Sequence, residues 1–213
     1  MINYDLARKD MINNQLKKKG IVDKNTLSAF EKIHRHLFVG ENDKGHSYDD
    51  SALSIGYGQT ISQPYIVALM TQLLKPNRND VILEIGTGSG FQAAILSTMC
   101  KFVISIERIP ELAAFAKKNI SETGSDNVQI FVGDGSLGWK ANAPYDGIMV
   151  TAGSEVLPQV LLAQLKPGGR MIIPLGSEDS HKLTLIKKEE DGYITEEMTD
   201  CHFVPLIGRK HNA

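Results

Sequence analysis

Residues 81–90 constrain the fold more than any other part of the chain. They read Val-Ile-Leu-Glu-Ile-Gly-Thr-Gly-Ser-Gly, an apolar run followed by three alternating glycines. Such a run predicts a buried strand that leads into a nucleotide-binding turn. Residues 91–99 predict a helix whose N-terminus faces the same turn, where backbone N–H groups can bind a ligand. We therefore expect a cofactor at this turn.

The spacing of the glycines distinguishes between cofactor classes. A dinucleotide fingerprint needs Gly-x-Gly-x-x-Gly, whereas this chain has Gly-x-Gly-x-Gly with Phe91 in the last glycine position of that fingerprint. The observed pattern resembles the first motif of S-adenosylmethionine-dependent methyltransferases. A buried strand followed by a glycine turn that binds no ligand is the alternative. The expected cofactor-binding residues at this turn are Gly86, Thr87, Gly88, Ser89 and Gly90.

Strand and helix patterns alternate beyond residue 64. A helix is expected from Pro64 to about Lys75, because proline suits the first turn of a helix. The alternation predicts an α/β fold, a Rossmann-like and mostly parallel sheet with helices on both faces. Two further apolar runs flank a polar turn at 189–192 and predict a terminal antiparallel pair at 183–186 and 201–204. The expected strands are 81–85, 102–106, 128–132, 146–151 and 169–174, and the expected helices are 91–99, 110–122 and 156–165.

The first 63 residues have a different character. Apolar residues at helical spacing predict one helix that ends at Gly20 and a second that follows Asp23 as N-cap and reaches Leu37. Residues 39–63 are rich in glycine, serine and aspartate and predict a long loop, either functional or disordered. The chain has 213 residues, 42% of them hydrophobic, which suits one domain. We expect a single domain, 1–213, with an N-terminal helical and substrate-side lobe at 1–63 and a cofactor-binding core with C-terminal strands at 64–213.

Composition limits the partners of this chain. A net charge of -2 gives no overall basic field, so a nucleic-acid partner is not expected. The N-terminus carries charges where a signal peptide needs an apolar core, and no run reaches the ~18 apolar residues of a membrane span. The two cysteines and six histidines lack the spacing of a metal site. We expect a cytoplasmic protein without a metal, and the sequence does not determine its oligomeric state.

Acidic residues follow two of the expected strands. Ligands of open α/β sheets bind at the carboxyl ends of the strands. Glu107 follows the strand at 102–106, where a carboxylate can accept hydrogen bonds from both ribose hydroxyls. Asp134 follows the strand at 128–132 and, beside Gly135, is placed to meet an adenine amino group. An exposed acid without a ligand and an ordinary turn are the respective alternatives.

Residues 55–64 make the resemblance specific. They read Ile-Gly-Tyr-Gly-Gln-Thr-Ile-Ser-Gln-Pro, which resembles the signature loop of protein-L-isoaspartate O-methyltransferases. One segment departs from the family pattern: members usually carry a Val-Pro-Arg-like run before Phe38, whereas this chain has Ile33-His34-Arg35 without a proline. The departure leaves open how the second helix ends. Further segments match the family in order, namely 11–16, 83–90, 106–108, 133–135, 164–170, 173–176 and 203–206.

The resemblance implies a function and a set of site residues. It implies S-adenosylmethionine as methyl donor and, as acceptor, the α-carboxylate of L-isoaspartyl residues in damaged proteins and peptides, with repair through a succinimide. It also implies that Ser62 is the active-site residue. Local sequence alone makes Ser62 equally an N-cap of the helix that begins at Pro64, and the two roles are compatible. Thr60 is expected at the cofactor, and Ile61, Val204 and Pro205 are expected to shape a peptide groove.

The chemistry can be considered without the family. An acceptor carboxylate with a pKa of about 4 is already ionised at neutral pH, so no general base is needed. The site must align the anion and remove water from it, and the Ser62 hydroxyl can donate one hydrogen bond to it. Two other functions stay open: a methyltransferase of another acceptor, such as a small molecule or RNA, and a non-catalytic S-adenosylmethionine-binding protein.

Overall fold

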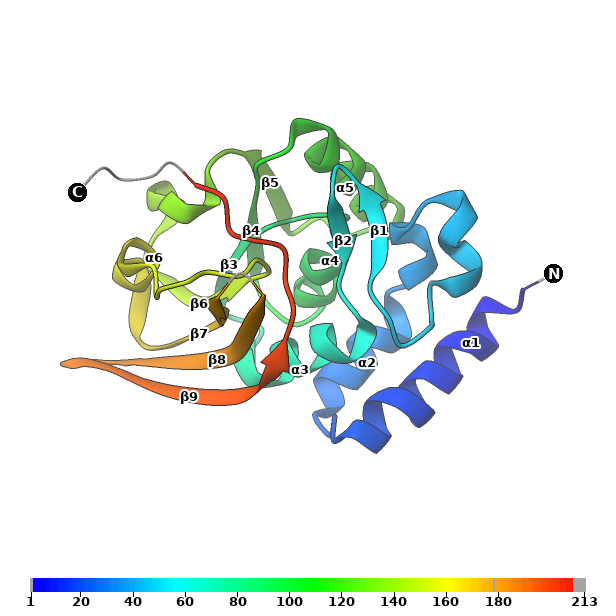
Figure 1. The fold of residues 1–213 in the computed structure, drawn as a ribbon, viewed down its shortest axis with the longest axis horizontal. Helices are drawn as coiled ribbons and strands as arrows, with labels where there is room; N and C mark the ends of the chain where they lie inside the picture. Colours follow the sequence, from blue (N-terminus) through cyan, green and yellow to red (C-terminus); the bar gives the residue numbers. More distant parts are fainter. Residues whose placement is uncertain (1, 178, 209–213) are drawn as a thin grey trace.

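A computed structural model describes residues 2–177 and 179–208. Within these ranges a seven-stranded sheet has the order β5-β4-β3-β6-β7-β8-β9 (Figure 1). The strands β3 to β7 pair in parallel, while β8 and β9 are antiparallel. The predicted Rossmann-like sheet is thereby confirmed. Its strands are β3 (Val81–Ile85), β4 (Phe102–Glu107), β5 (Val128–Val132), β6 (Tyr145–Val150), β7 (Leu165–Ser177), β8 (Ser180–Glu189) and β9 (Gly192–Cys201).

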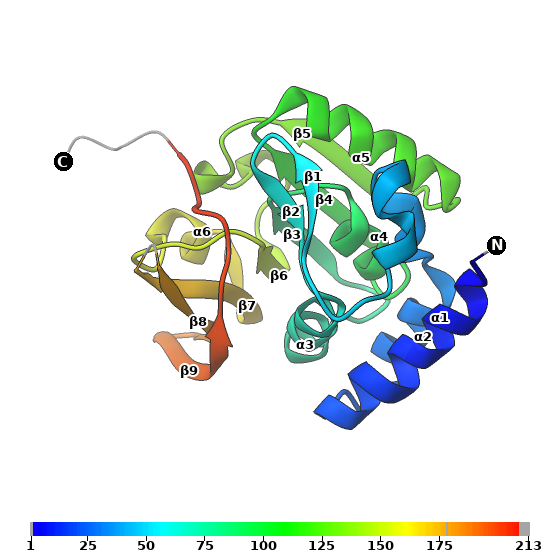
Figure 2. The same cartoon turned by 45° about the vertical axis from the view of Figure 1, so that its right-hand side comes forward.

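Alternate side chains of the central strands enter two hydrophobic cores, one on each face of the sheet. On β3, Ile82 packs into one core and Leu83 into the other, as the period of two in a strand requires. The first core also contains side chains of α3 (Pro64–Leu74), α4 (Phe91–Ser97) and α5 (Pro110–Glu122). The second contains side chains of α6 (Gln159–Ala163), on the other side of the sheet (Figures 1 and 2). The helix predicted at 156–165 is thus shorter than expected, and β7 begins four residues before the predicted position.

The N-terminal segment packs as helices against the first core. Helix α1 (Tyr4–Asp10) continues as π and 3-10 turns to Gly20, which takes a left-handed conformation. Helix α2 (Lys24–Lys32) is capped by Asp23, whose carboxylate accepts a hydrogen bond from the Thr26 backbone N–H at 2.7 Å. Side chains from this segment share one core with α3, α4 and α5.

The second predicted helix is too long. Helix α2 ends at Lys32, because Ile33 is extended, and Arg35–Phe38 form a separate 3-10 turn. Arg35 is fully buried, and its Nε donates a hydrogen bond of 2.7 Å to the Ser47 carbonyl oxygen. The side chain thereby fixes the segment that leads into the next part of the chain.

Residues 39–63 contain more regular structure than the predicted loop. They include a 3-10 helix, Glu41–His46, and an antiparallel hairpin of β1 (Leu53–Gly56) and β2 (Gln59–Ile61). These two strands have four and three residues, too few to show a clear alternation in the sequence. The hairpin lies in front of α4 and ends just before α3 (Figure 2).

The predicted terminal antiparallel pair is present, but its second strand is 192–201 and not 201–204. Strand β8 pairs instead with β9 through a tight turn, and Leu185 lies opposite Glu196. The chain after β9 returns to the loop that follows β6 (Figure 1). There the Gly153 N–H donates to the Val204 carbonyl at 2.8 Å, and the Leu206 N–H donates to the Gly153 carbonyl at 2.7 Å. None of the described helices is long and apolar enough to cross a membrane.

Candidate functional site

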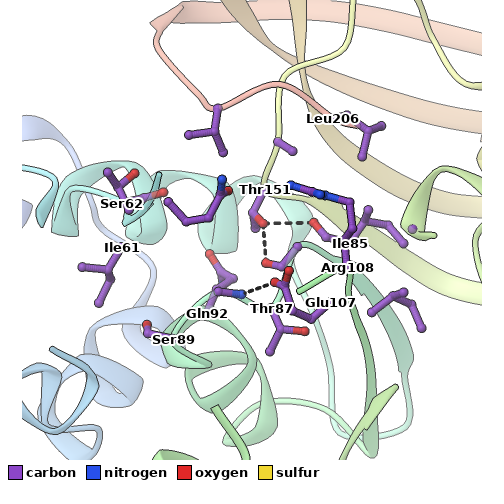
Figure 3. A pocket seen from close by; sticks show the side chains of 18 of the residues that line it. Ile61, Ser62, Ile85, Thr87, Ser89, Gln92, Glu107, Arg108, Thr151 and Leu206 are labelled. Atoms are coloured by element: carbon purple, nitrogen blue, oxygen red, sulfur yellow. Dashed lines mark hydrogen bonds between the residues drawn. The ribbon is translucent and has the colours of Figure 1, made fainter. Parts of the chain in front are cut away.

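A pocket, here called the central pocket, lies at the carboxyl ends of β3, β4 and β6. The strand order reverses at β3, and such a point is where open α/β sheets bind ligands. Main-chain groups of the glycine turn and polar side chains from several strand ends line the central pocket together. Figure 3 shows Ile61 and Ser62 on one side of the pocket and Glu107 and Arg108 on the other.

The turn after β3 requires glycine at its first position. Gly86 has a φ of +94°, in the left-handed region, and a Cβ there would meet Thr151 Oγ1. The Thr151 hydroxyl lies within hydrogen-bond distance of the Ile85 carbonyl, at 2.9 Å, and the Gly86 carbonyl, at 2.5 Å. The close approach therefore ties the glycine turn to the end of β6 and brings backbone to the pocket surface.

Glu107, at the end of β4, joins two turns. Its Oε2 accepts a hydrogen bond of 2.8 Å from the Gly88 N–H, and its Oε1 accepts one of 2.9 Å from the Ile109 N–H. The residue is 6% exposed and lines the central pocket. A carboxylate has about four acceptor positions, so Glu107 retains capacity for hydroxyl groups of a ligand.

Most of the predicted site residues line the central pocket together. They come from the β1–β2 hairpin, the glycine turn, the ends of β4 and β5, and the segment after β9. The parts of the fold that the sequence analysis treated as separate motifs therefore meet around one cavity. The predicted residues in its lining are Thr60, Ile61, Ser62, Gly86, Thr87, Gly88, Ser89, Glu107, Gly135, Val204 and Pro205.

Two predicted cofactor-binding residues do not line the central pocket. Gly90 lies beneath the turn, where a Cβ would come within 3.2 Å of Ala116 and Ile120 of α5. Asp134 caps a 3-10 turn, and its Oδ1 accepts hydrogen bonds from the Ser136 backbone N–H and hydroxyl at 3.0 and 2.6 Å. Cofactor contacts by Gly90 and Asp134 stay predictions.

The lining also includes residues that the sequence analysis did not identify. Arg108 directly follows Glu107, and Thr151 is the last residue of the strand predicted at 146–151, so both occupy the strand ends where ligands bind. Gln92 lies in the first turn of α4 and carried no comparable signal. Its exposure to the pocket depends on how the helix is rotated, which the sequence does not reveal.

Ser62 lies where the central pocket meets a second hollow, here called the outer pocket. The outer pocket runs from Asp50 to Gln63 on one side and from Asp200 to Val204 on the other. The N-cap of α3 is Gln63, without a side-chain capping bond, so Ser62 is not the N-cap considered from the sequence. Gln63 Nε2 instead donates to the Asp50 carbonyl at 3.0 Å and to Asp50 Oδ1 at 2.7 Å. The residues common to both pockets are Thr60, Ser62, Thr151 and Val204.

Comparison with known proteins agrees with this arrangement. The family model of protein-L-isoaspartate(D-aspartate) O-methyltransferases matches residues 7–211. The chain belongs to this family. A protein-L-isoaspartate O-methyltransferase of Trichlorobacter lovleyi is 50% identical over 211 residues, which are 99% of this chain and 97% of that protein.

Solved structures of the protein-L-isoaspartate O-methyltransferase family have the same fold. One structure with that name aligns with a TM-score of 0.85 and 30% identity, over 94% of this chain and 66% of the other, longer chain. A Plasmodium falciparum structure assigned to the family, in complex with S-adenosyl-L-homocysteine, aligns with a TM-score of 0.82 over 97% of this chain and 99% of that one. At 24% identity this second likeness concerns the fold alone.

In this member of the protein-L-isoaspartate O-methyltransferase family, Glu84 carries a second carboxyl group, which lies behind the glycine turn. It is fully buried and accepts a hydrogen bond from the Ser105 hydroxyl, which in turn lies 2.6 Å from Thr87 Oγ1. Burial raises the pKa of Glu84 to about 8, because a charge is poorly solvated there. The carboxyl group therefore stays protonated in the folded protein at neutral pH.

Glu84 should make the stability of the fold depend on pH. The unfolded chain releases this proton near pH 4.5, whereas the folded protein holds it until about pH 8, so Glu84 lowers the free energy of unfolding as pH rises through this window. Glu84→Gln cannot ionise and should lack that contribution. Urea unfolding at pH 5, 7 and 9 should show the variant gaining stability relative to the wild type as pH rises. A difference that is constant with pH would contradict the protonated state.

Proposed function

We propose that this chain transfers a methyl group from S-adenosylmethionine to the α-carboxylate of L-isoaspartyl residues in damaged proteins and peptides, and so initiates their repair through a succinimide. The observation that carries the proposal is the position of Ser62 between two pockets. One pocket lies at the strand ends where such sheets bind nucleotides, and the other runs between residues 50–63 and 200–204. Family membership and the relative with 50% identity support the same reaction.

The central pocket fits the donor. Glu107 is placed to accept hydrogen bonds from the ribose hydroxyls, and the backbone of Gly86 and Gly88 is open to a ligand because these residues have no side chain. Gly135 lines the pocket beyond Glu107, next to Asp134, and supports an adenine position there. When bound, S-adenosylmethionine supplies an electrophilic methyl group on a sulfonium. Thr60, Thr87 and Ser89 complete the proposed donor site, and Gly90 supports the turn from beneath.

The outer pocket fits a peptide acceptor. Ser62 is half-buried at its inner end, where its hydroxyl can donate a hydrogen bond to a carboxylate. Ile61 and Val204 flank this position, and Pro205 continues the wall on the central-pocket side. The backbone of Val204 and Leu206 is already held by Gly153, so this wall is fixed before a peptide arrives. A repair enzyme meets many sequences, and contacts to peptide backbone serve that need better than pockets for particular side chains.

The chain needs no general base for this reaction. An isoaspartyl α-carboxylate is ionised at neutral pH, and its oxygen displaces the methyl group from sulfur in line. The work of the site is to align the carboxylate and exclude water from it. The product is a methyl ester. The neighbouring backbone nitrogen attacks its carbonyl carbon, methanol leaves, and the succinimide forms without a further catalytic residue.

A cytoplasmic location belongs to the same proposal. Cys100 and Cys201 are free thiols, and Cys100 is buried. Unpaired thiols are usual in proteins of reducing compartments, whereas secreted proteins more often pair them. Damaged cytoplasmic proteins are the corresponding partners.

Two peptides provide the direct test of the function. They are identical except that one carries an L-isoaspartyl and the other an L-aspartyl residue, and each is incubated with the protein and S-adenosylmethionine labelled in the methyl group. Base-labile label should appear on the isoaspartyl peptide alone, because the donor and acceptor sites meet at a carboxylate. Label on neither peptide, with donor binding confirmed by calorimetry, would contradict the proposal and favour another acceptor or a non-catalytic binder.

Ser62→Ala should slow transfer and spare donor binding. A hydrogen bond to a charged group contributes about 1.5–3 kcal/mol, so we expect roughly a 10- to 100-fold lower kcat/KM for the isoaspartyl peptide. The dissociation constant of S-adenosylmethionine should change less than about twofold. Ser54→Ala, on β1 of the same hairpin, is the matched control and should retain the wild-type rate. A wild-type rate in Ser62→Ala would remove Ser62 from the mechanism.

Glu107→Ala should weaken donor binding by at least about tenfold. The variant loses the proposed bonds to ribose and also leaves the N–H groups of Gly88 and Ile109 without their acceptor. Titration calorimetry with S-adenosylmethionine measures the effect, and thermal unfolding reports the accompanying loss of stability. Glu111→Ala, an exposed acid in the first turn of α5, is the control for charge. Unchanged affinity in Glu107→Ala would disprove its ribose role.

A further inference from the structure

Gln92 presents a buried polar atom that has no partner within the described part of the chain. The residue is 7% exposed and lines the central pocket, and its Oε1 lacks a hydrogen-bond donor there. Leaving a buried acceptor unsatisfied costs about 1–3 kcal/mol, and native proteins rarely do so without a reason. A ligand that brings an N–H or O–H group to this oxygen would provide that reason.

The neighbouring hydrogen bonds determine which end of the Gln92 amide is free. The Thr71 hydroxyl has one hydrogen, which it donates to the Val67 carbonyl at 2.8 Å within α3. Thr71 Oγ1 can therefore only accept from Gln92, and Gln92 Nε2 lies 3.0 Å from it. The amide NH₂ must face Thr71, so the group left for the pocket is the carbonyl oxygen. A ligand at this point must donate a hydrogen bond.

The position of Gln92 indicates which part of the donor it meets. Helix α3, which holds the Gln92 amide, packs against β6 and β7, whereas Glu107 ends β4 on the other side of β3. With the ribose at Glu107, the amino-acid end of the donor extends toward α3 and Ser62. That end carries an α-carboxylate, which only accepts hydrogen bonds, and an α-ammonium group, which has three N–H donors and no acceptor. Because the free Gln92 oxygen accepts, the ammonium group is the part that it can bind. Among the described residues of the lining, Glu107 is the one carboxylate, and the Gln92 Oε1 is a buried, unpaired side-chain acceptor held beside α3.

We propose that Gln92 binds the methyl donor through its Oε1, which accepts a hydrogen bond from the α-ammonium group of S-adenosylmethionine. The inference rests on the proposed function and adds a residue that fixes the amino-acid end of the donor. Because Thr71 holds the other end of the amide, the oxygen has a defined position. Gln92 and Glu107 thereby hold the amino-acid end and the ribose of the donor, on either side of the sulfonium, and set the place of the methyl group relative to Ser62.

A pair of ligands tests the proposal on one variant. S-adenosylhomocysteine carries the α-ammonium group, whereas 5′-methylthioadenosine has the same nucleoside and lacks the amino-acid part. Gln92→Met retains the length of the side chain and removes the acceptor. Titration calorimetry should show at least about tenfold weaker binding of S-adenosylhomocysteine and a change of less than about twofold for methylthioadenosine. Ser97→Ala, a buried hydroxyl on the same helix outside the central pocket, should leave both affinities unchanged.

Thr71→Val provides a second variant that retains Gln92 and removes the hydroxyl that holds its NH₂ group and donates to the Val67 carbonyl. It should weaken the binding of S-adenosylhomocysteine but not of methylthioadenosine, by a smaller factor than Gln92→Met does. It also keeps the test available if thermal unfolding shows that Gln92→Met does not fold. If Gln92→Met loses affinity equally for both ligands, the residue only shapes the pocket, and the proposal is overturned.

An unchanged S-adenosylhomocysteine affinity in Gln92→Met, with a raised KM for the isoaspartyl peptide, would also overturn the proposal by assigning the oxygen to the acceptor. The wild-type protein separates this result from failure of the proposed function. If the wild type binds neither ligand, the donor site itself is refuted. If the wild type binds both ligands and Gln92→Met binds them with unchanged affinity, only the inference about Gln92 fails.

Discussion

The geometry of the central pocket depends on one buried carboxylate. Glu107 accepts backbone hydrogen bonds from Gly88 and Ile109, and so joins the turns that follow two neighbouring strands. The sheet fixes where β3 and β4 end, and the Gly90 N–H donates to the Thr87 carbonyl at 2.9 Å within the first turn; the Glu107 carboxylate adds the bonds that join this turn to the one after β4. Because one side chain is hydrogen-bonded to both turns, it fixes their positions relative to each other. The same oxygens border the cavity, so the residue that builds the proposed donor site is also available to bind in it.

The sequence predicted the central strands well because of where they lie. Strands β3, β4 and β6 have neighbours on both sides and helices or other cover on both faces, so they are nearly continuous apolar runs bounded by turn residues. Strand β9 lies at the edge of the sheet and is exposed along most of its length. Its polar composition gave no apolar pattern, and the apolar residues at 201–204 were mistaken for the strand. The β1–β2 hairpin was missed because its strands are too short to show a clear alternation.

The site was predictable to the extent that topology places strand ends together. Glu107 and the glycine turn followed from the rule that parallel strands carry their ligands at one edge. Gln92 depends instead on the rotation of α4 and on a contact with Thr71, twenty-one residues earlier. Gly90 is the opposite case. Its place in the motif suggested a ligand contact, whereas in the structure its lack of a side chain lets α5 pack close to the turn. Contacts between elements distant in the sequence decide such cases.

The return of the chain to Gly153 determines at what stage of synthesis the central pocket can be completed. Residues 204–207 form a wall of the central pocket and are among the last described residues to be made. A nascent chain on the ribosome that has not passed residue 204 lacks this wall and the backbone partners of Gly153. The sheet core from β3 to β6 is translated well before that point. The central strands can therefore pair before the wall formed by residues 204–207 has been synthesised, and the pocket is complete only after it.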